Sequence, residues 1–279
     1  MIRRALIPTA GLATRLGPIG RAVPKVLLPL PGPGGGVQPV LVRLIDELRA
    51  AGIEHVGLIV SPGQQEMIQQ FIQAAEQEAP LGVEVTCIPQ PSPEGFGHAV
   101  LCSRATVGDE AFVLVLADHI RTDGAAATQV VRAFESLPQP AAVVGMHVVP
   151  ARTVSSAGVA SGQPVDGALY RCTALIEKPS PAVARKQLIT PGLPNDHFLA
   201  HAGVYAFSSE IFDCLNELDN AGERPLELSA AQAMLLSRHP QAYYLFRMDG
   251  RVWDIGTAAD YVEAFAALTG RTETSDPTP

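Results

Sequence analysis

The chain contains few cysteines and few aromatic residues, and both shortages narrow the classes of protein to which it can belong. Only 4 of its 279 residues are Cys, and 5% are aromatic. The cysteines lie far apart and form no CxxC pair, so neither a disulfide framework nor a zinc site is indicated. They are Cys87, Cys102, Cys172 and Cys214. We therefore expect reduced thiols in a cytoplasmic protein.

Long apolar runs are also missing. The longest, residues 111–117, is far shorter than the roughly 20 residues that cross a bilayer. The N-terminal stretch, residues 1–8, begins with charge followed by apolar residues, but Pro8, Gly11 and Arg15 interrupt it before the apolar core of a secretory signal can form. We expect no membrane segment and interpret the start of the chain as a β-strand.

Positive charge is in short supply, and lysine in particular is rare. The chain has 20 basic and 28 acidic residues, a net charge of −8, which argues against a surface that binds nucleic acid. Only Lys25, Lys178 and Lys186 are lysines; the other basic residues are Arg. A retained lysine is consistent with a site that needs a compact ammonium group, although chance explains three lysines equally well.

What is present is the composition of a globular protein with a regular alternation of strands and helices. Hydrophobic residues make up 47% and charged residues 17%. We expect strands at 4–8, 55–60, 83–88, 112–117, 141–149, 199–207 and 243–247, and helices at 40–51, 64–78, 97–104, 126–136, 209–216, 226–237 and 258–268. This alternation predicts an α/β fold with a largely parallel sheet covered by helices on both faces. Ligands then bind at the carboxyl ends of the strands.

The pattern changes at about residue 150. Short segments with turn residues between 158 and 177 predict an antiparallel hairpin, and 188–196 reads as a proline-rich loop. We expect a single domain over 1–270, with a nucleotide-binding half at 1–150 and a second half at 151–270. The polar residues 271–279 are expected to be a disordered tail.

A glycine-containing loop follows the first strand. Residues 9–18 lead to Pro24-Lys25, so that Arg15 and Lys25 can supply positive charge to a polyphosphate beside Gly11. A tight turn with a solvated Arg explains the same residues. The G-x-G-x-x-G dinucleotide pattern and the GxxxxGK[ST] phosphate loop are both absent. The loop, 11–39, is longer than ordinary strand-to-helix connections, which favours a functional role.

A second loop, 90–95, precedes a predicted helix. The Gln90 side chain can donate to and accept from the edge of a base, and Gly95 lets a base lie against the backbone. A proline- and glycine-containing turn that enters a helix is an equally good explanation.

Two aspartates follow strands. Asp118 comes at the end of an apolar strand, and Asp254 comes after a strand and before a helix. Two carboxylates, together with substrate phosphates and waters, are the ligands that Mg²⁺ prefers. Asp254 can alternatively cap the helix that follows. His119 can ligate a metal, but a lone histidine there more often packs or forms a hydrogen bond.

A third group of residues ends the predicted hairpin. The Glu177 carboxylate can accept from two sugar hydroxyls while the Lys178 ammonium holds a phosphate. A solvated ion pair is the alternative. Gly158 and Gly203 can allow a sugar ring to come close to the backbone, or simply mark turns.

Taken together, these motifs resemble the sugar-1-phosphate nucleotidylyltransferases, and most closely the bacterial UTP:glucose-1-phosphate uridylyltransferases. That family carries AGxGTR followed by PK near its start. The matching segments here are Ala10-Gly11-Leu12-Ala13-Thr14-Arg15, Pro24-Lys25, Gly95-Phe96-Gly97-His98-Ala99-Val100-Leu101-Cys102, Asp118, Gly158-Val159, Glu177-Lys178-Pro179, Gly203 and Trp253-Asp254-Ile255-Gly256. The ordered matches extend over some 250 residues of the chain.

The resemblance implies a three-layer α/β/α fold with a mixed, mostly parallel central sheet, in which the second half binds a sugar phosphate. It implies UTP and a sugar 1-phosphate as substrates, Mg²⁺ as cofactor and a homo-oligomer. Roles carried over residue by residue are catalytic for Arg15 and Lys25, nucleotide-binding for Ala10, Gly11, Gln90 and Gly95, sugar-phosphate-binding for Gly158, Glu177, Lys178 and Gly203, and metal-binding for Asp118 and Asp254.

The chain also departs from the family pattern. Ala13 stands where the family has a second loop glycine, and Ala230 stands where the uridylyltransferases have Asp. The loop 90–95 is equally similar to that of the glucose-1-phosphate thymidylyltransferases. Besides uridylyl transfer to glucose 1-phosphate, two alternatives therefore remain open: a thymidylyltransferase that uses dTTP, and a non-catalytic sensor of nucleotide sugars.

Overall fold

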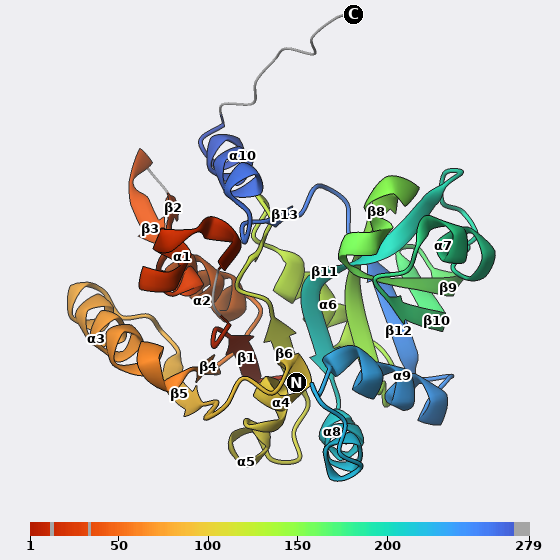
Figure 1. Cartoon of the computed structure of the whole chain (residues 1–279), viewed down its shortest axis with the longest axis horizontal. Helices are drawn as coiled ribbons and strands as arrows, with labels where there is room; N and C mark the ends of the chain where they lie inside the picture. Colours follow the sequence, from red (N-terminus) through yellow and green to blue (C-terminus); the bar gives the residue numbers. More distant parts are fainter. Residues whose placement is uncertain (12–13, 33–34, 271–279) are drawn as a thin grey trace, which may run out of the picture.

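The computed structural model describes residues 1–11, 14–32 and 35–270 (Figure 1). Ala13 and the predicted disordered tail, 271–279, lie outside these residues. No helix in the described part of the chain is long and apolar enough to cross a membrane.

A nine-stranded sheet runs through the molecule. Its strand order is β5-β4-β1-β6-β11-β8-β12-β10-β9. These strands are β1 (Arg4–Pro8), β4 (His55–Val60), β5 (Glu84–Pro89), β6 (Phe112–Val115), β8 (Ala142–Pro150), β9 (Gly158–Asp166), β10 (Leu169–Glu177), β11 (His197–Phe207) and β12 (Tyr243–Arg247). Among these strands β11 and β10 run against the common direction, so the expected mixed, mostly parallel sheet is confirmed.

Helices cover both faces of this sheet (Figure 1). The helices are α1 (Pro18–Ala22), α2 (Val40–Ala50), α3 (Pro62–Glu78), α4 (Phe96–Leu101), α5 (Arg104–Val107), α6 (Ala126–Glu135), α7 (Pro181–Gln187), α8 (Glu210–Asn220), α9 (Leu228–Arg238) and α10 (Ala258–Leu268). One core lies beneath α2 and α6, and a second lies beneath α4, α8 and α9. The three-layer α/β/α arrangement predicted from the sequence is therefore confirmed.

The helix α2 shows how the sequence produces this layering. Its buried residues are Val40, Leu41, Leu44, Ile45 and Leu48, which share one face at helical spacing. Gly52 follows the helix with a φ of 87°, a conformation that ends helices and that glycine adopts at little cost.

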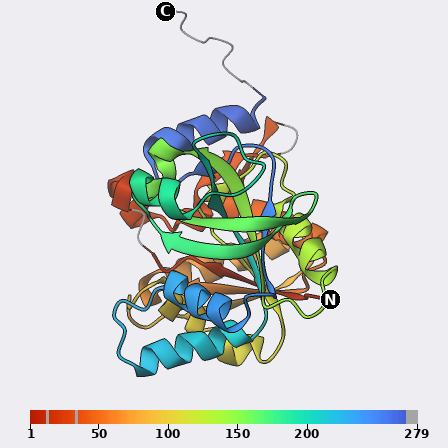
Figure 2. The ribbon, with the colours of Figure 1, turned by 90° about the vertical axis from the view of Figure 1, so that its right-hand side faces the viewer.

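The second half of the chain folds the sheet back on itself. The predicted hairpin is present as β9 and β10, which pair along their length. The first residues of β9 also pair with β11 at Val159 and Ala160, so this end of the sheet closes into a curved unit (Figure 2). A third, small core fills the space beneath this curved unit. It lies under α7 and a 3₁₀ segment, η4 (Ala151–Ser156).

Several local elements were not predicted from the sequence. The long loop 11–39 contains the 3₁₀ turns η1 (Thr14–Leu16) and η2 (Lys25–Leu27), the helix α1 and two short paired strands, β2 (Pro29–Pro31) and β3 (Val37–Pro39). The helix α7 was not predicted; the Ser180 hydroxyl caps it by accepting from the Val183 amide. Two further two-residue strands, β7 (His119–Ile120) and β13 (Trp253–Asp254), carry too few residues for any periodicity to reveal them.

Candidate functional site

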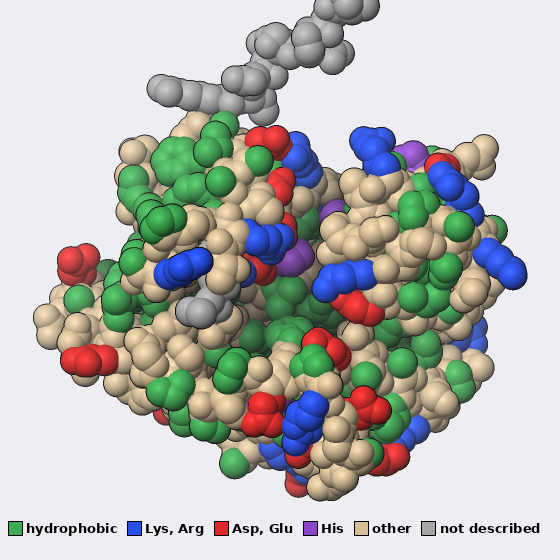
Figure 3. Space-filling model, viewed as in Figure 1, with side chains coloured by type: hydrophobic (Ala, Val, Ile, Leu, Met, Phe, Trp, Pro, Cys, Tyr) green, Lys and Arg blue, Asp and Glu red, His purple; other side chains and the backbone are tan. Residues whose placement is uncertain are grey.

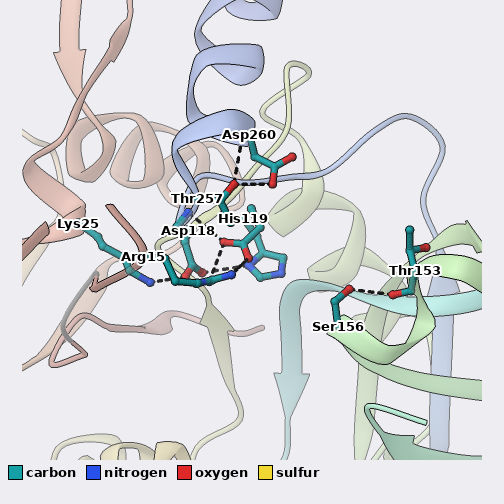
Figure 4. Close-up of polar contacts among 10 residues, drawn as sticks. Arg15, Lys25, Asp118, His119, Thr153, Ser156, Thr257 and Asp260 are labelled. Carbon is teal, nitrogen blue, oxygen red and sulfur yellow. Dashed lines mark hydrogen bonds and ion pairs between the residues drawn. The ribbon is translucent and has the colours of Figure 1, made fainter. Parts of the chain in front are cut away.

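Four charged residues predicted from the sequence meet at the carboxyl end of β6. Lys25 Nζ lies 2.5 Å from Asp118 Oδ2, and Arg15 Nη1 lies 2.9 Å from Asp254 Oδ2 (Figure 4). Lys25 begins η2 and Arg15 lies in η1, so the loop after β1 delivers both cations to the two carboxylates. The structure thus joins groups from both ends of the chain.

Pairing between β7 and β13 brings the two carboxylates together. Asp254 stands opposite His119 in this antiparallel pair. The Ile255 amide donates to the Asp118 carbonyl at 2.8 Å, and the Gly256 amide donates to Asp254 Oδ1 at 2.9 Å. The alternative role of Asp254 as a helix cap is wrong, because the Thr257 hydroxyl caps α10 by accepting from the Asp260 amide.

Gly256 lies within this cluster, although the sequence argument gave it no role. A Cβ on Gly256 would lie 2.7 Å from Arg15 Nη2, 2.8 Å from Asp254 Oδ1 and 3.4 Å from Lys25 Nζ. Any side chain here would force these charged groups apart. The signal in the sequence was its position two residues after Asp254.

The Asp118 carboxylate is ionised in spite of its burial. Burial acts to raise the pKa of Asp118, but the hydrogen bond and charge of His119 and the charge of Lys25 outweigh it and hold the pKa well below its ordinary value. The His119 contact is 3.0 Å from Nδ1 to Asp118 Oδ1. His119 therefore acts here as a hydrogen-bonding neighbour of the carboxylate.

The donor set fits Mg²⁺. Asp118 and Asp254 offer carboxylate oxygens, which this hard cation prefers. In the described part of the chain no group of three or more His, Cys, Asp or Glu side chains is placed to hold a metal. Asp118 and Asp254 would thus be the ligands from the protein, and phosphate oxygens and waters would supply the others.

The predicted sugar-phosphate residues from the hairpin also come together. Glu177 stands opposite Gly158 in the β9–β10 pair, and Lys178 Nζ lies 3.5 Å from Glu177 Oε1. Lys178 has a φ of 46°, a left-handed conformation that costs about 1–3 kcal/mol in a residue with a side chain. Its amide donates to the Ala157 carbonyl, which holds this bend at the end of β10.

His201, a residue that the sequence argument missed, lies beside Gly158 and Glu177. A Cβ on Gly158 would lie 2.7 Å from His201 Nδ1 and 2.9 Å from Glu177 Oε2, so Gly158 lets both groups come close to the backbone. Burial lowers the pKa of His201 to about 3, which makes it neutral. Its Nδ1 lies 3.4 Å from the Tyr205 hydroxyl, and its Nε2 has no hydrogen-bond partner among the described residues. The available signal was a histidine inside a strand that, apart from its first residue, His197, is otherwise apolar.

Gly203 lies between the charged cluster around Asp118 and the sugar-phosphate residues near His201. It has a φ of 80°, and an added Cβ would lie only 2.4 Å from His119 Cβ. The register of β11 against β8 shifts between His201 and Tyr205, so Gly203 lies in an irregular stretch of the strand. The steric reason for glycine here is therefore the contact with His119.

The residues predicted to face the base, Gln90 and Gly95, contact each other in the loop before α4. Gln90 Nε2 donates to the Gly95 carbonyl at 3.2 Å and lies 3.1 Å from His98 Nδ1. Gly95 has a φ of 116°, and its added Cβ would lie 2.3 Å from the Leu226 carbonyl oxygen. Residues 90–95 form a loop with a bend at Ser92 that enters α4, and the hydrogen-bond contacts of Gln90 use its Nε2 rather than its Oε1.

The remaining predicted residues lie near the start of the loop. Ala10 is half-buried, Gly11 is exposed, and no described atom lies within 4 Å of a Cβ added to Gly11. The substituted Ala230 is exposed on α9.

Figure 3 shows a hollow between the two halves of the chain, with basic, acidic and histidine side chains along its walls and apolar side chains at its floor.

One protein family matches nearly the whole chain. The model of the nucleotidyl transferase family covers residues 4–271. A UTP–glucose-1-phosphate uridylyltransferase of Bacillus subtilis is 28% identical over 286 residues, which cover 96% of this chain and 89% of that protein.

Solved structures show the same fold. A UDP-glucose pyrophosphorylase complexed with UDP-glucose has a TM-score of 0.79 at 23% identity, covering 98% of this chain and all of that one. A UTP-bound UGPase from Acinetobacter baumannii has a TM-score of 0.76 at 23% identity, covering 98% of this chain and 95% of that one. The chain therefore belongs to the nucleotidyl transferase family of enzymes, and its resemblance to the sugar-1-phosphate nucleotidylyltransferases is confirmed.

Proposed function

We propose that the protein transfers a uridylyl group from UTP to glucose 1-phosphate in the presence of Mg²⁺, giving UDP-glucose and pyrophosphate. The observation that carries the proposal is the presence of two ion pairs at the site, in which two cations suited to phosphates contact two carboxylates suited to a metal. The names of the similar proteins support the choice of substrates.

The charged residues supply electrostatic stabilisation. A phosphate oxygen of glucose 1-phosphate attacks the α-phosphorus of UTP in line, a new P–O bond forms, and the bond to pyrophosphate breaks. Lys25 and Arg15 leave their carboxylates and hold the phosphate oxygens, which lowers the energy of the negative charge in the transition state. No protein nucleophile is required.

Asp118 and Asp254 would hold Mg²⁺, whose role when bound is to neutralise phosphate charge. Asp118 remains ionised at neutral pH, as this role requires. Asp118 and Asp254 pair with Lys25 and Arg15, so the carboxylates would be free to hold a metal where the two cations contact substrate phosphates instead.

Substrate selection falls to the two remaining groups. Gln90, held by the Gly95 carbonyl and His98, would accept from the N3–H of a uracil ring through its Oε1. Glu177 would accept from sugar hydroxyls, and Lys178 would contact the sugar phosphate.

A thymidylyltransferase is the second candidate, because thymine presents the same N3–H to Gln90 and because the loop 90–95 resembles that branch equally. The test is a matrix of initial rates of pyrophosphate release, with UTP and dTTP each combined with glucose 1-phosphate and several other sugar 1-phosphates. Highest kcat/KM with UTP and glucose 1-phosphate supports the proposal. Preference for dTTP selects the second candidate, and binding of nucleotide sugars without any release identifies a sensor.

Assembly and location belong to the same proposal. We propose a homo-oligomer in the cytoplasm, where UTP and sugar phosphates are available. Sedimentation analysis of the full chain tests the assembly, and a single species with the mass of one chain, 29.4 kDa, would contradict it.

A further inference from the structure

The two carboxylates of the site stand on short segments that the large sheet does not hold directly. Asp118 precedes β7 and Asp254 ends β13, and these two-residue strands form a separate two-stranded sheet. A two-stranded pair is marginally stable on its own, and here it has two residues on each side. The Ile255 amide donates to the Asp118 carbonyl, and a side-chain contact farther from the carboxylates adds to this link between the two segments.

The Arg121 side chain makes that contact. Arg121 directly follows β7, and its Nη2 donates to the carbonyl of Asp249, in the segment that leads to β13. One guanidinium thus ties the segment after Asp118 to the segment before Asp254. With 5% of its side chain exposed, Arg121 is buried.

Two further contacts hold Arg121 in place. Its Nε and Nη2 donate to the two oxygens of Asp123 at 3.1 Å and 2.5 Å. Arg43, on α2, donates to the Arg121 carbonyl at 2.7 Å, which anchors the segment to the helix layer. The hydrogen bond and charge of Arg121 hold the pKa of Asp123 below its ordinary value, although burial acts to raise it.

Stability alone does not explain this arrangement. Arg121 Nη1 is buried without a hydrogen-bond partner in the described part of the chain, which is a cost, and ion pairs of this kind are often no more stable than apolar residues of similar size. Nη2 alone donates to both Asp123 and the Asp249 carbonyl, and Nε adds a second bond to Asp123, so the planar fork fixes the direction in which Nη2 reaches Asp249. A lysine offers one nitrogen and cannot form the second bond that sets this direction.

We propose that Arg121 is a positioning residue that fixes Asp254 relative to Asp118 and so sets the geometry of the metal site. This inference rests on the proposed function, since it assigns Arg121 to the same metal-dependent reaction. It does not place Arg121 in contact with a substrate or with the metal.

The test uses Arg121→Met and Arg121→Lys, with Asp123→Asn as the matched control. The amide introduced by Asp123→Asn still accepts from Arg121 and leaves the bond to the Asp249 carbonyl in place, while the charge of the ion pair is removed. The readouts are the Mn²⁺ affinity of the full chain in the presence of UTP, measured by electron paramagnetic resonance, and hydrogen exchange of the amides of residues 249–256 without ligands. The Mg²⁺ dependence and the KM for the sugar phosphate complete the set.

We expect Arg121→Met to weaken metal binding on the order of tenfold, within the range known for residues that orient metal ligands. Exchange of the Ile255 and Gly256 amides should rise, and the KM for the sugar phosphate should stay close to that of the wild type. The metal affinity and amide exchange of Arg121→Lys should lie between those of Arg121→Met and the wild type. Those of Asp123→Asn should stay close to the wild type. A variant that loses thermal stability alone, with unchanged metal affinity and exchange, would overturn the proposal.

The outcomes for the wild type separate this inference from the proposed function. If the wild type binds Mn²⁺ with UTP but releases no pyrophosphate, the proposed reaction is wrong while the positioning role is still measured by metal affinity and exchange. If the wild type is active and Arg121→Met changes neither, the positioning role is wrong and the reaction stands.

Discussion

Lys25 Nζ and Asp118 Oδ2 lie 2.5 Å apart, and both side chains are largely buried. Each of these residues therefore has a charged partner before any substrate arrives. Removing either one has two effects: it takes a group from the site, and it leaves the opposite charge partly buried without a partner. Variants of the site should be interpreted with both effects in mind.

Lys25→Met should reduce kcat by about 10²–10³, the usual cost of removing one group that stabilises developing charge. The matched control is Lys186→Met, because Lys186 is exposed on α7, away from the charged cluster. Initial rates at saturating UTP and sugar phosphate measure the effect. Equal rates for the two variants would show that Lys25 does not act on the reacting phosphates.

Gly95→Ala should destabilise the protein. Its φ of 116° is unfavourable for any other residue, and the added Cβ would collide with the Leu226 backbone. We expect the free energy of unfolding, measured with urea, to fall by about 1–3 kcal/mol. An unchanged urea midpoint would show that the loop accommodates the added methyl group.

Gly11→Ala, unlike Gly95→Ala, should leave the stability of the protein nearly unchanged. No described atom lies near an added Cβ at Gly11, so the urea midpoint should change little. If this backbone approaches the nucleotide, the KM for UTP should rise. A Gly11→Ala variant with wild-type KM and kcat would remove Gly11 from the nucleotide site.

The stability of the protein should depend on the protonation of His201. Its pKa is about 3 in the folded chain because it is buried, and about 6.5 in the unfolded chain. The unfolded state therefore binds more protons between these values, so the free energy of unfolding falls as the pH drops below about 6.5. His201→Phe should make this dependence shallower between about pH 7 and pH 5, measured by urea unfolding at each pH. An unchanged slope would mean that His201 is not buried as a neutral side chain.

The layers of the fold could be predicted from the sequence because they depend on periodicity. The apolar face of α2 and the continuous apolar strand β6 each consist of several apolar residues at regular spacing. Each of these residues therefore supports the same prediction of a helix or a strand. The sequence also indicated Asp118 and Asp254, since each follows a strand. It did not reveal that β7 and β13 pair, because two residues carry no period.

The contacts that shape the site were less predictable because they join residues far apart in the chain. Gly158 and Gly203 were predicted to let a sugar ring come close to the backbone or to mark turns, and nothing local to them indicates His201 and His119 as the side chains they accommodate. The same holds for Arg121, whose partner at position 249 is a backbone carbonyl that any residue would supply. Folding alone brings these groups together.

Release of pyrophosphate from UTP and glucose 1-phosphate, measured as a function of Mg²⁺ concentration, tests the central claim most directly. The wild type should show release that requires Mg²⁺, and Asp118→Ala should lose it while still folding to a protein with a cooperative unfolding transition. Release that persists at wild-type rate in Asp118→Ala, or that proceeds equally well without a divalent cation, would contradict the account.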